Sequence, residues 1–259
     1  MGIGDDVIWL GEAWHRYQTM GLKSRPTRDG RPHTFKLAWA NCDYVDMHEG
    51  VPLEERTNEV RPYAASIDYV CKPARFVLSE EEQLQAQEFY NNEPYWLICP
   101  DVKQRLHYKN KDWGWRNWVD LVGIIAQHRP RQRLVRLHSP TSVIQIAYVE
   151  NIPCESVRDM ISLSRQASLI ITTEGAWHHI AAAHRIPAVV LYGHCTSPDP
   201  SEKHQHSGTG YPGQCNITSD TGPCYDTKGT CTICPEVWRQ MKPKLVYERI
   251  EEYVRTYLL

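Results

Sequence analysis

The stretch SLIITTEGAWHHIAAAHRIPAVVLYG, residues 168–193, decides the fold class of this chain. It opens with an apolar, β-branched run that predicts a buried strand, and AVVLYG at 188–193 predicts another. Between them, AWHHIAAAH at 176–184 is made largely of small and apolar residues and predicts a helix that begins directly after Gly175. A strand, a helix and a strand of these lengths predict parallel strands in one sheet.

The same alternation extends to both sides of this stretch. The further predicted elements are strands at 95–100 and 133–138 and helices at 79–92, 115–128, 155–166 and 244–259. The first of these helices opens with Ser79 and Glu82, which have the spacing of a capping box. Repeated strand–helix units predict a parallel sheet whose ligands bind beyond the carboxyl ends of the strands.

The N-terminal residues follow a different pattern. MGIGDD is interpreted as a loop, and apolar residues at helical spacing follow it from Val7 to about Tyr17. A glycine-rich turn that leads into a helix N-terminus is a candidate anion or substrate site, and it contains Asp5 and Asp6. For both aspartates the alternative is simple capping of the helix. Residues 23–36, KSRPTRDGRPHTFK, predict a basic loop broken by proline and glycine.

Composition narrows the class of protein. The chain has 29 Lys and Arg against 31 Asp and Glu, so no global positive field attracts it to nucleic acid or anionic lipid. Hydrophobic residues make up 41% of the chain, which is typical of a globular protein. The apolar runs are shorter than the ~18 residues that a membrane-spanning helix needs. Nine cysteines, an odd number, favour a reducing, cytoplasmic location.

The turn from the strand at 168–173 into the next helix carries the first candidate site. The glycine of Thr173-Glu174-Gly175 lets a ligand approach the backbone, and the helix N-terminus offers free N–H groups and a positive dipole end. His178 and His179 can donate hydrogen bonds to phosphate oxygens, while Glu174 can hold ribose or sugar hydroxyls. The alternative is a well-capped helix whose two histidines only pack or face solvent.

Two further loops are expected at the same edge of the sheet. GHCTSP follows the strand at 188–193 and adds Gly193, Thr196 and Ser197 to the candidates. HYKNKDWGWRNWVDLV follows the strand at 95–100 and carries Lys109 and Lys111, whose ammonium groups suit a diphosphate. The alternative for the second loop is a solvated basic segment whose tryptophans belong to the core.

These motifs together resemble glycosyltransferase family 9, the ADP-heptose:lipopolysaccharide heptosyltransferase group. The resemblance rests on NKDWGWRNW, ENIPCESVRDMISLSRQASLIITT, TEGAWHHIAAA and GHCTSP, and more weakly on GIGDD near the N-terminus. It implies an α/β, GT-B-like fold of two Rossmann-like halves with parallel sheets. We expect a reduced N-terminal acceptor-side domain at 1–92. A nucleotide-sugar-binding domain at 93–259 would include a cysteine-rich loop at 194–235.

The resemblance also implies roles for single residues. Lys111 matches the phosphate-binding lysine of the family, and Asp5 matches the aspartate proposed there as general base, with Asp6 in reserve. The glycine and histidine of TEGAWHH match the donor motif, but one residue is inserted. Counting from the glycine selects His178 and counting back from the alanines selects His179, so both stay candidates.

The C-terminal cysteines suggest a different chemistry. Four of them, ending in a C-x-x-C pair, have ligand types that suit a structural zinc ion: Cys215, Cys224, Cys231 and Cys234. His204 and His206 lie nearby as extra possible ligands. Free thiols or a disulfide within the loop are the alternatives.

The expected function is transfer of a sugar from a nucleotide-sugar donor to a hydroxyl of a glycan or lipopolysaccharide-type acceptor. We expect inversion at the sugar and no metal or other cofactor in catalysis. The first alternative is a phage-type DNA glycosyltransferase acting on a hydroxymethylated pyrimidine, with loop 23–36, Arg129, Arg131 and Arg133 on the DNA phosphates. The second alternative is a non-catalytic nucleotide-sugar-binding protein.

Overall fold

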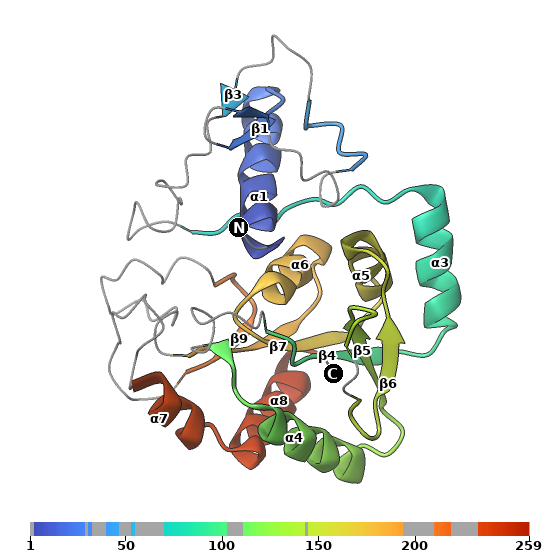
Figure 1. Cartoon of the computed structure of the whole chain (residues 1–259), viewed down its shortest axis with the longest axis vertical. Coiled ribbons are helices and arrows are strands. Elements are labelled where there is room, and N and C mark those ends of the chain that lie inside the picture. Colours follow the sequence, from blue (N-terminus) through green and yellow to red (C-terminus); the bar gives the residue numbers. More distant parts are fainter. Residues whose placement is uncertain are drawn as a thin grey trace.

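A computed structural model of the chain describes residues 3–28, 31–32, 40–46, 53–54, 70–102, 111–142, 145–193, 210–218 and 233–258. A six-stranded sheet in which all neighbours are parallel forms its centre (Figure 1). Its strands are β4 (Tyr95–Cys99), β5 (Arg133–His138), β6 (Glu150–Pro153), β7 (Leu169–Thr173), β8 (Ala188–Leu191) and β9 (Cys215–Ile217). The spatial order is β6-β5-β4-β7-β8-β9.

This order defines a doubly wound sheet. If these six strands are numbered one to six along the chain, starting at β4, their order across the sheet is 3-2-1-4-5-6. This is the strand order of dinucleotide-binding domains. The chain therefore reverses its direction of winding between β4 and β7, which pair in parallel from Trp96 and Leu169 onward. Ligands of such sheets bind at this switch point, outside the carboxyl ends of the two strands.

Helices cover both faces of the sheet. They are α1 (Ile3–Met20), α3 (Glu80–Tyr90), α4 (Trp115–His128), α5 (Val157–Ser164), α6 (Ala176–His184), α7 (Ile233–Gln240) and α8 (Pro243–Tyr257). Figure 1 shows α5 and α6 on one side of the sheet and α4 and α8 on the other. Both faces are thus removed from water, which explains why the strand sequences are nearly continuous apolar runs.

The side chains of β4 illustrate how one strand serves two cores. Trp96 and Ile98 belong to the buried cluster that includes α4 and α8, with Val122 and Ile250 among its members. The alternate residues of β4, such as Leu97, belong to the cluster on the α5 and α6 side. This two-residue alternation follows from the pleat of a strand and anchors β4 between two helical layers.

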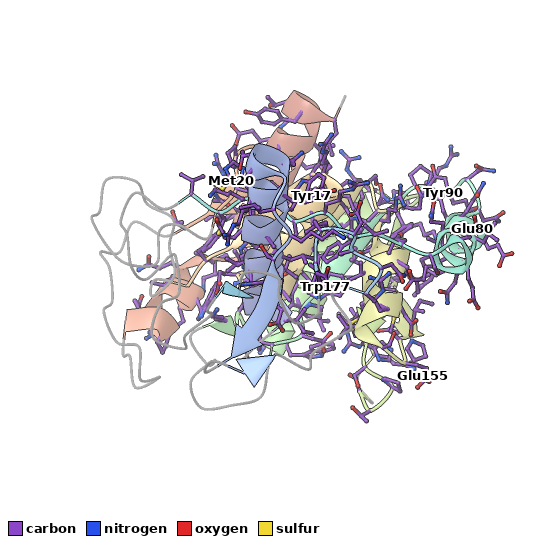
Figure 2. The ribbon with its side chains drawn as sticks, turned by 90° about the horizontal axis from the view of Figure 1, so that it is seen from above. Tyr17, Met20, Glu80, Tyr90, Glu155 and Trp177 are labelled. Carbon is purple, nitrogen blue, oxygen red and sulfur yellow. The ribbon has the colours of Figure 1, made fainter. Side chains whose placement is uncertain are left out.

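The N-terminal residues pack on the side of the sheet that α6 covers. α1 is followed by a small sheet of β1 (Arg25–Arg28), β2 (Arg31–Pro32) and β3 (Leu53–Glu54), in which β1 pairs antiparallel with β2 and parallel with β3. Seen from above in Figure 2, α1 with Tyr17 and Met20 lies over the middle of the molecule, and α3, from Glu80 to Tyr90, lies at its edge. None of the described helices has the length and apolar character needed to cross a membrane.

Most predicted elements are confirmed, and the N-terminal loop is a correction. The helix at 115–128, the strand at 133–138 and the helix at 176–184 have the bounds of α4, β5 and α6, and the capping box of Ser79 is present. Residues 3–6, by contrast, do not form the predicted loop, because α1 already begins at Ile3. Acidic residues in a first helical turn interact favourably with the positive helix end, which suits helix rather than loop.

Candidate functional site

The segments that leave β4 and β7 meet at the switch point. Glu174 directly follows β7 and is only 6% exposed, and its carboxylate forms an ion pair with the ammonium of Lys111, from the segment after β4. The side chain of Lys111 keeps about a quarter of its surface exposed, at 24%, so the pair opens toward solvent on the lysine side. The structure thus brings together the two loops that the sequence analysis assigned to one edge of the sheet.

Two buried histidines complete this edge. His178 is fully buried and His179 nearly so, and their ring centroids are 3.8 Å apart. The backbone N–H of Gly175 donates to Nδ1 of His178 at 3.0 Å, so Nδ1 is an acceptor and the neutral ring carries its proton on Nε2. Nδ1 of His179 lies 2.8 Å from the hydroxyl of Tyr211.

The environment keeps His179 uncharged. Burial lowers its pKa well below the ordinary value of 6.5, and electrostatic interactions with His178 and Lys111 lower it further. At neutral pH this ring therefore takes part in hydrogen bonds without adding a charge. The fixed positive charge of the site comes from Lys111.

The first turns of α1 and α6 touch at the same place. A Cβ atom on Gly4 would lie 3.2 Å from Cδ2 of His179 and 3.5 Å from Cα of Ala176, so only glycine allows this approach without displacement. Gly175, the N-cap residue of α6, has no side chain that could accept from the N–H groups of the first turn. Two positive helix ends and an ammonium group therefore converge on one location, which is the electrostatic requirement for binding an anion.

The other predicted residues fall into two groups. Thr173 is buried at the end of β7, Gly193 is buried shortly after β8, and Asp6 is buried in α1, where the backbone of Asp5 lies beside it. Outside the described residues lie Lys109, Thr196, Ser197, Cys224, Cys231, His204, His206 and the side chains of Asp5 and Cys234. For these residues the structure leaves the predictions as they stand.

Sequence reasoning missed two residues that support the histidines. Besides the bond from Tyr211 to His179, the side-chain amide of Gln214 donates to the backbone carbonyl of His178 at 2.8 Å. Both residues come from the turn before β9, more than thirty residues further along the chain. No periodicity or motif marks them, because their role depends on β9 pairing with β8.

A metal ion is the other ligand that this cluster suggests. The candidate ligand atoms of Glu174, His178 and His179 lie within 4.8 Å of one another, and two histidines with one carboxylate are a known ligand set. However, Nε2 of His178 carries the proton when Nδ1 accepts from the backbone, and Lys111 already neutralises Glu174. A cation bound here would therefore have to displace both of these interactions.

The predicted zinc site is described at one ligand only. Cys215 is a free thiol in β9, and burial raises its pKa. A thiol with a raised pKa is a weaker metal ligand until a cation displaces its proton. The zinc site stays a prediction because the other three thiols lie outside the described side chains.

Two arginines proposed to contact DNA are engaged elsewhere. Arg129 pairs with Glu251 at 2.6 Å, and Arg133 pairs with Glu150 at 2.9 Å. Arginines held by carboxylates of the same chain are poor candidates for phosphate contacts. The predicted loop 23–36 is also a correction, because it contains strands β1 and β2. Its residues 29–30 and 33–36 lie outside the described residues.

The sheet order defines a doubly wound α/β protein with a GT-B type of fold, and the candidate anion site lies at its switch point. The chain belongs to glycosyltransferase family 9 (heptosyltransferase), whose sequence profile matches residues 55–209, more than half of its 259 residues. No curated protein matches the chain.

Solved structures with a similar fold agree with this class. ADP-heptose lps heptosyltransferase II of E. coli is 18% identical with a TM-score of 0.50, and a family 9 glycosyl transferase of Veillonella parvula is 15% identical with a TM-score of 0.50. In both cases the match covers 71% of this chain and 54% of the solved chain. The match to TibC of enterotoxigenic E. coli, an iron-containing dodecameric glycosyltransferase, is 18% identical with a TM-score of 0.47 and covers 71% of this chain and 49% of that one. The chain thus spans about half the length of these structures.

Proposed function

We propose that this chain transfers a sugar from a nucleotide-sugar donor to a hydroxyl group of an acceptor glycan. The observation that carries the proposal is the convergence of Lys111, His178 and the N-terminus of α6 at the switch point of the sheet. A nucleoside diphosphate needs this combination, because its oxygens carry the charge that cations and N–H donors stabilise.

The same groups stabilise the departing diphosphate during the reaction. As the bond from the anomeric carbon to the phosphate oxygen breaks, negative charge grows on the diphosphate, and Lys111 and His178 neutralise it by charge and hydrogen bonding. Glu174 holds the ammonium of Lys111 in place before the donor binds. When the diphosphate becomes the partner of Lys111, the carboxylate of Glu174 accepts hydrogen bonds from ribose or sugar hydroxyls.

The acceptor is activated from the α1 side of the site. Asp5 takes the proton of the acceptor hydroxyl. The oxygen of that hydroxyl then forms the new bond to the anomeric carbon from the face opposite the departing diphosphate, which inverts the configuration of the carbon. Asp6 is the reserve candidate. The contact of the first turn of α1 with α6 supports this role, since Gly4 lies against His179 and Ala176. This mechanism needs no metal ion, because the positive charge comes from the protein.

The family narrows the donor and the acceptor. The E. coli heptosyltransferase II structure is named for ADP-heptose and lipopolysaccharide, so ADP-sugars are the first donors to test and a lipopolysaccharide-type glycan the first acceptor. Residues 93–259 would bind the donor and residues 1–92 the acceptor. The comparisons give no support to DNA as acceptor.

Binding of ADP to a set of charge variants tests the donor site. Lys111→Met should weaken ADP by about 1.5–3 kcal/mol, the contribution of a charge-assisted hydrogen bond. It should also lower stability by about 1–3 kcal/mol, because it leaves the buried carboxylate of Glu174 without its partner. Calorimetric titration and urea unfolding measure the two effects.

The double variant Lys111→Met/Glu174→Gln separates binding from folding. It removes both charges, so stability should return toward that of the unchanged protein while ADP binding stays weak. Full ADP affinity in the double variant would place the donor elsewhere. Mass spectrometry of acceptor glycans incubated with ADP-sugars then tests transfer itself, and binding without any transfer would favour a non-catalytic binding protein.

A further inference from the structure

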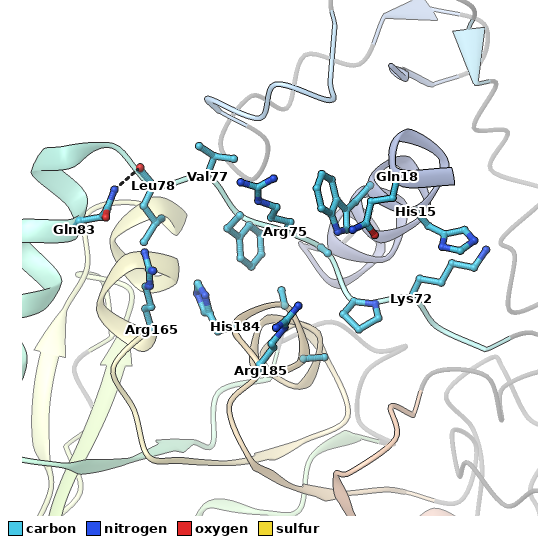
Figure 3. Close-up of a pocket in the computed structure, with 16 residues that line it drawn as sticks. His15, Gln18, Lys72, Arg75, Val77, Leu78, Gln83, Arg165, His184 and Arg185 are labelled. Carbon is cyan, nitrogen blue, oxygen red and sulfur yellow. Dashed lines mark hydrogen bonds between the residues drawn. The ribbon is translucent and has the colours of Figure 1, made fainter. Parts of the chain in front are cut away.

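A second cavity lies at the other end of α6. It has a volume of about 740 Å³, is open on one side, and is lined by the outer half of α1, the segment 72–78 and the C-terminal ends of α5 and α6 (Figure 3). Arg185 follows His178 by seven positions in the chain, which amounts to roughly 10 Å along a helix axis. The cavity is therefore a separate place from the site at the switch point.

The walls of this cavity carry several arginines. Arg75 approaches from the segment 72–78, and Arg165 and Arg185 approach from the ends of α5 and α6 (Figure 3). Lys72 also lines the cavity, but it pairs with Glu12 at 2.9 Å. Among the residues that the structure describes, no carboxylate forms an ion pair with any of the three arginines.

Arg75 is held ready for a ligand. Its guanidinium lies over the ring of Trp14, 4.7 Å from the centroid, an arrangement that leaves the N–H edge of the group available. Its backbone carbonyl accepts hydrogen bonds from the hydroxyl of Tyr44 and the thiol of Cys42. Both contacts limit the freedom of the segment, so little order has to be created when an anion binds.

Arg185 occupies a position where arginine is not the expected residue. It caps α6 in the left-handed region, with φ of 59°, where glycine is strongly preferred. A positive charge at a helix C-terminus interacts favourably with the dipole, and this would account for Arg165 and Arg185 alone. It does not account for Arg75, which lies on no helix and faces the same cavity.

The histidine beside these arginines adds no charge. His184 donates from Nε2 to the carbonyl of Ile161 at 2.9 Å, and its ring packs against Phe76 with centroids 5.2 Å apart. Burial lowers its pKa to about 4, so it is neutral at physiological pH. The floor of the cavity is thus partly aromatic, and its rim is cationic.

We propose that this cavity binds a small polyanion that carries at least two phosphate or carboxylate groups, at a site separate from the donor site. Three guanidinium groups from three segments match several anionic groups on one compact ligand, because each can form paired hydrogen bonds with phosphate or carboxylate. Trp14 and Phe76 offer apolar surface to the body of such a ligand, for instance a sugar ring. The site does not depend on the proposed transfer reaction.

Calorimetric titration with two probes tests the site. Fructose 1,6-bisphosphate presents phosphates on a sugar, and citrate presents carboxylates, so the two arms distinguish the source of the charge. The key variant is Arg165→Gln/Arg185→Gly, since glycine removes a charge at the position where it also relieves backbone strain. The matched control is Arg116→Gln on α4, an exposed arginine on the opposite side of the sheet.

The expected result is binding of at least one probe, weakened at least tenfold in the double arginine variant and unchanged in Arg116→Gln. The melting temperature of the double variant should not fall, which excludes unfolding as the cause. Lys111→Met/Glu174→Gln should keep the binding. Absence of binding by both probes, full affinity in the double arginine variant, or loss of affinity only in the Lys111 and Glu174 variant would each overturn the proposal.

Discussion

Single residues in the first turn of α1 carry the chemical step in the proposed mechanism. The turn lies against α6, and Asp6 in it is buried. An ionised carboxylate can take a proton from an acceptor hydroxyl, and an amide of the same shape cannot.

Replacing Asp5 separates catalysis from helix stabilisation. Asp5→Asn should lower turnover by about 10²–10⁴-fold, the contribution of a positioned general base, while ADP affinity stays nearly intact. Loss of one charge from the first turn should cost only about 0.3–1 kcal/mol of stability. Steady-state kinetics beside Asp6→Asn check this, and near-normal turnover in both variants would mean that the base is another residue.

Among the elements, α1 is held by a close approach that depends on one glycine. A Cβ on Gly11 would lie 2.0 Å from the carbonyl oxygen of Lys72, so the helix and the segment 72–78 touch through their backbones. The neighbouring side chains Val7, Leu10 and Ala13 are buried with Ile161 and Ile180. The position of α1 over α5 and α6 therefore depends on backbone contact as well as apolar burial.

Two glycine-to-alanine changes measure this contact. In a helix without other constraints alanine is favoured over glycine by about 1 kcal/mol. Gly123→Ala on α4, where a Cβ would meet nothing within 4 Å, should therefore raise stability slightly. Gly11→Ala should instead lower it by about 1–3 kcal/mol or more, because the backbone has to move. Equal effects of the two changes in urea unfolding would show that α1 is not packed in this way.

The end of α6 makes stability depend on pH. The pKa of His184 is lowered by burial to about 4 from an ordinary value of 6.5, although its hydrogen bond to Ile161 acts in the opposite direction. Between these values the unfolded chain binds a proton that the folded chain does not, so this contribution is complete above pH 6.5 and is lost as the pH falls to 4. The loss amounts to about 3 kcal/mol.

His184→Gln should flatten this dependence. Glutamine can donate the same hydrogen bond to Ile161 but does not titrate, so the free energy of unfolding should fall less steeply between pH 6.5 and pH 4 than in the unchanged protein. Urea titrations at several pH values give the slope. Parallel curves for the two proteins would assign the acid sensitivity to other groups.

At the scale of the whole molecule, the proposed halves share one core. Leu10 of α1 and Ile180 of α6 lie in the same buried cluster. Cys215, the predicted zinc ligand whose side chain is described, lies at the edge of the sheet, where β9 pairs with β8. A bound ion there would stabilise the edge strand and, through it, Tyr211 and Gln214.

A zinc ion bound by the C-terminal cysteines should affect the stability of the whole fold. Protein purified without chelators should carry about one equivalent of zinc, and its removal should lower the melting temperature, since metal binding adds to the free energy of folding. Cys231→Ser should lose the metal, whereas Cys154→Ala, at a buried free thiol before α5, should keep it. Metal-free protein with an unchanged melting temperature would contradict the site.

Sequence by itself determined the elements with strong periodicity. β4, α4, β5 and α6 were predicted to within a residue, because apolar strands and amphipathic helices signal themselves locally. β6 was missed since ENIP is polar and lies at the edge of the sheet, and three-residue β9 is too short to carry a pattern. α7 was missed because it begins at the end of the cysteine-rich stretch, and that stretch was predicted to consist of turns.

The candidate site also has a part that could be predicted from the sequence and a part that only the structure reveals. Sequence placed Lys111, Glu174 and the two histidines together, because the ends of parallel strands meet at one edge whatever the details. Only the tertiary structure decided that Lys111 pairs with Glu174, that Tyr211 and Gln214 hold the histidines, and that three arginines surround a second cavity. These contacts join residues far apart in the chain, and a local pattern carries no information about which distant partner a side chain will meet.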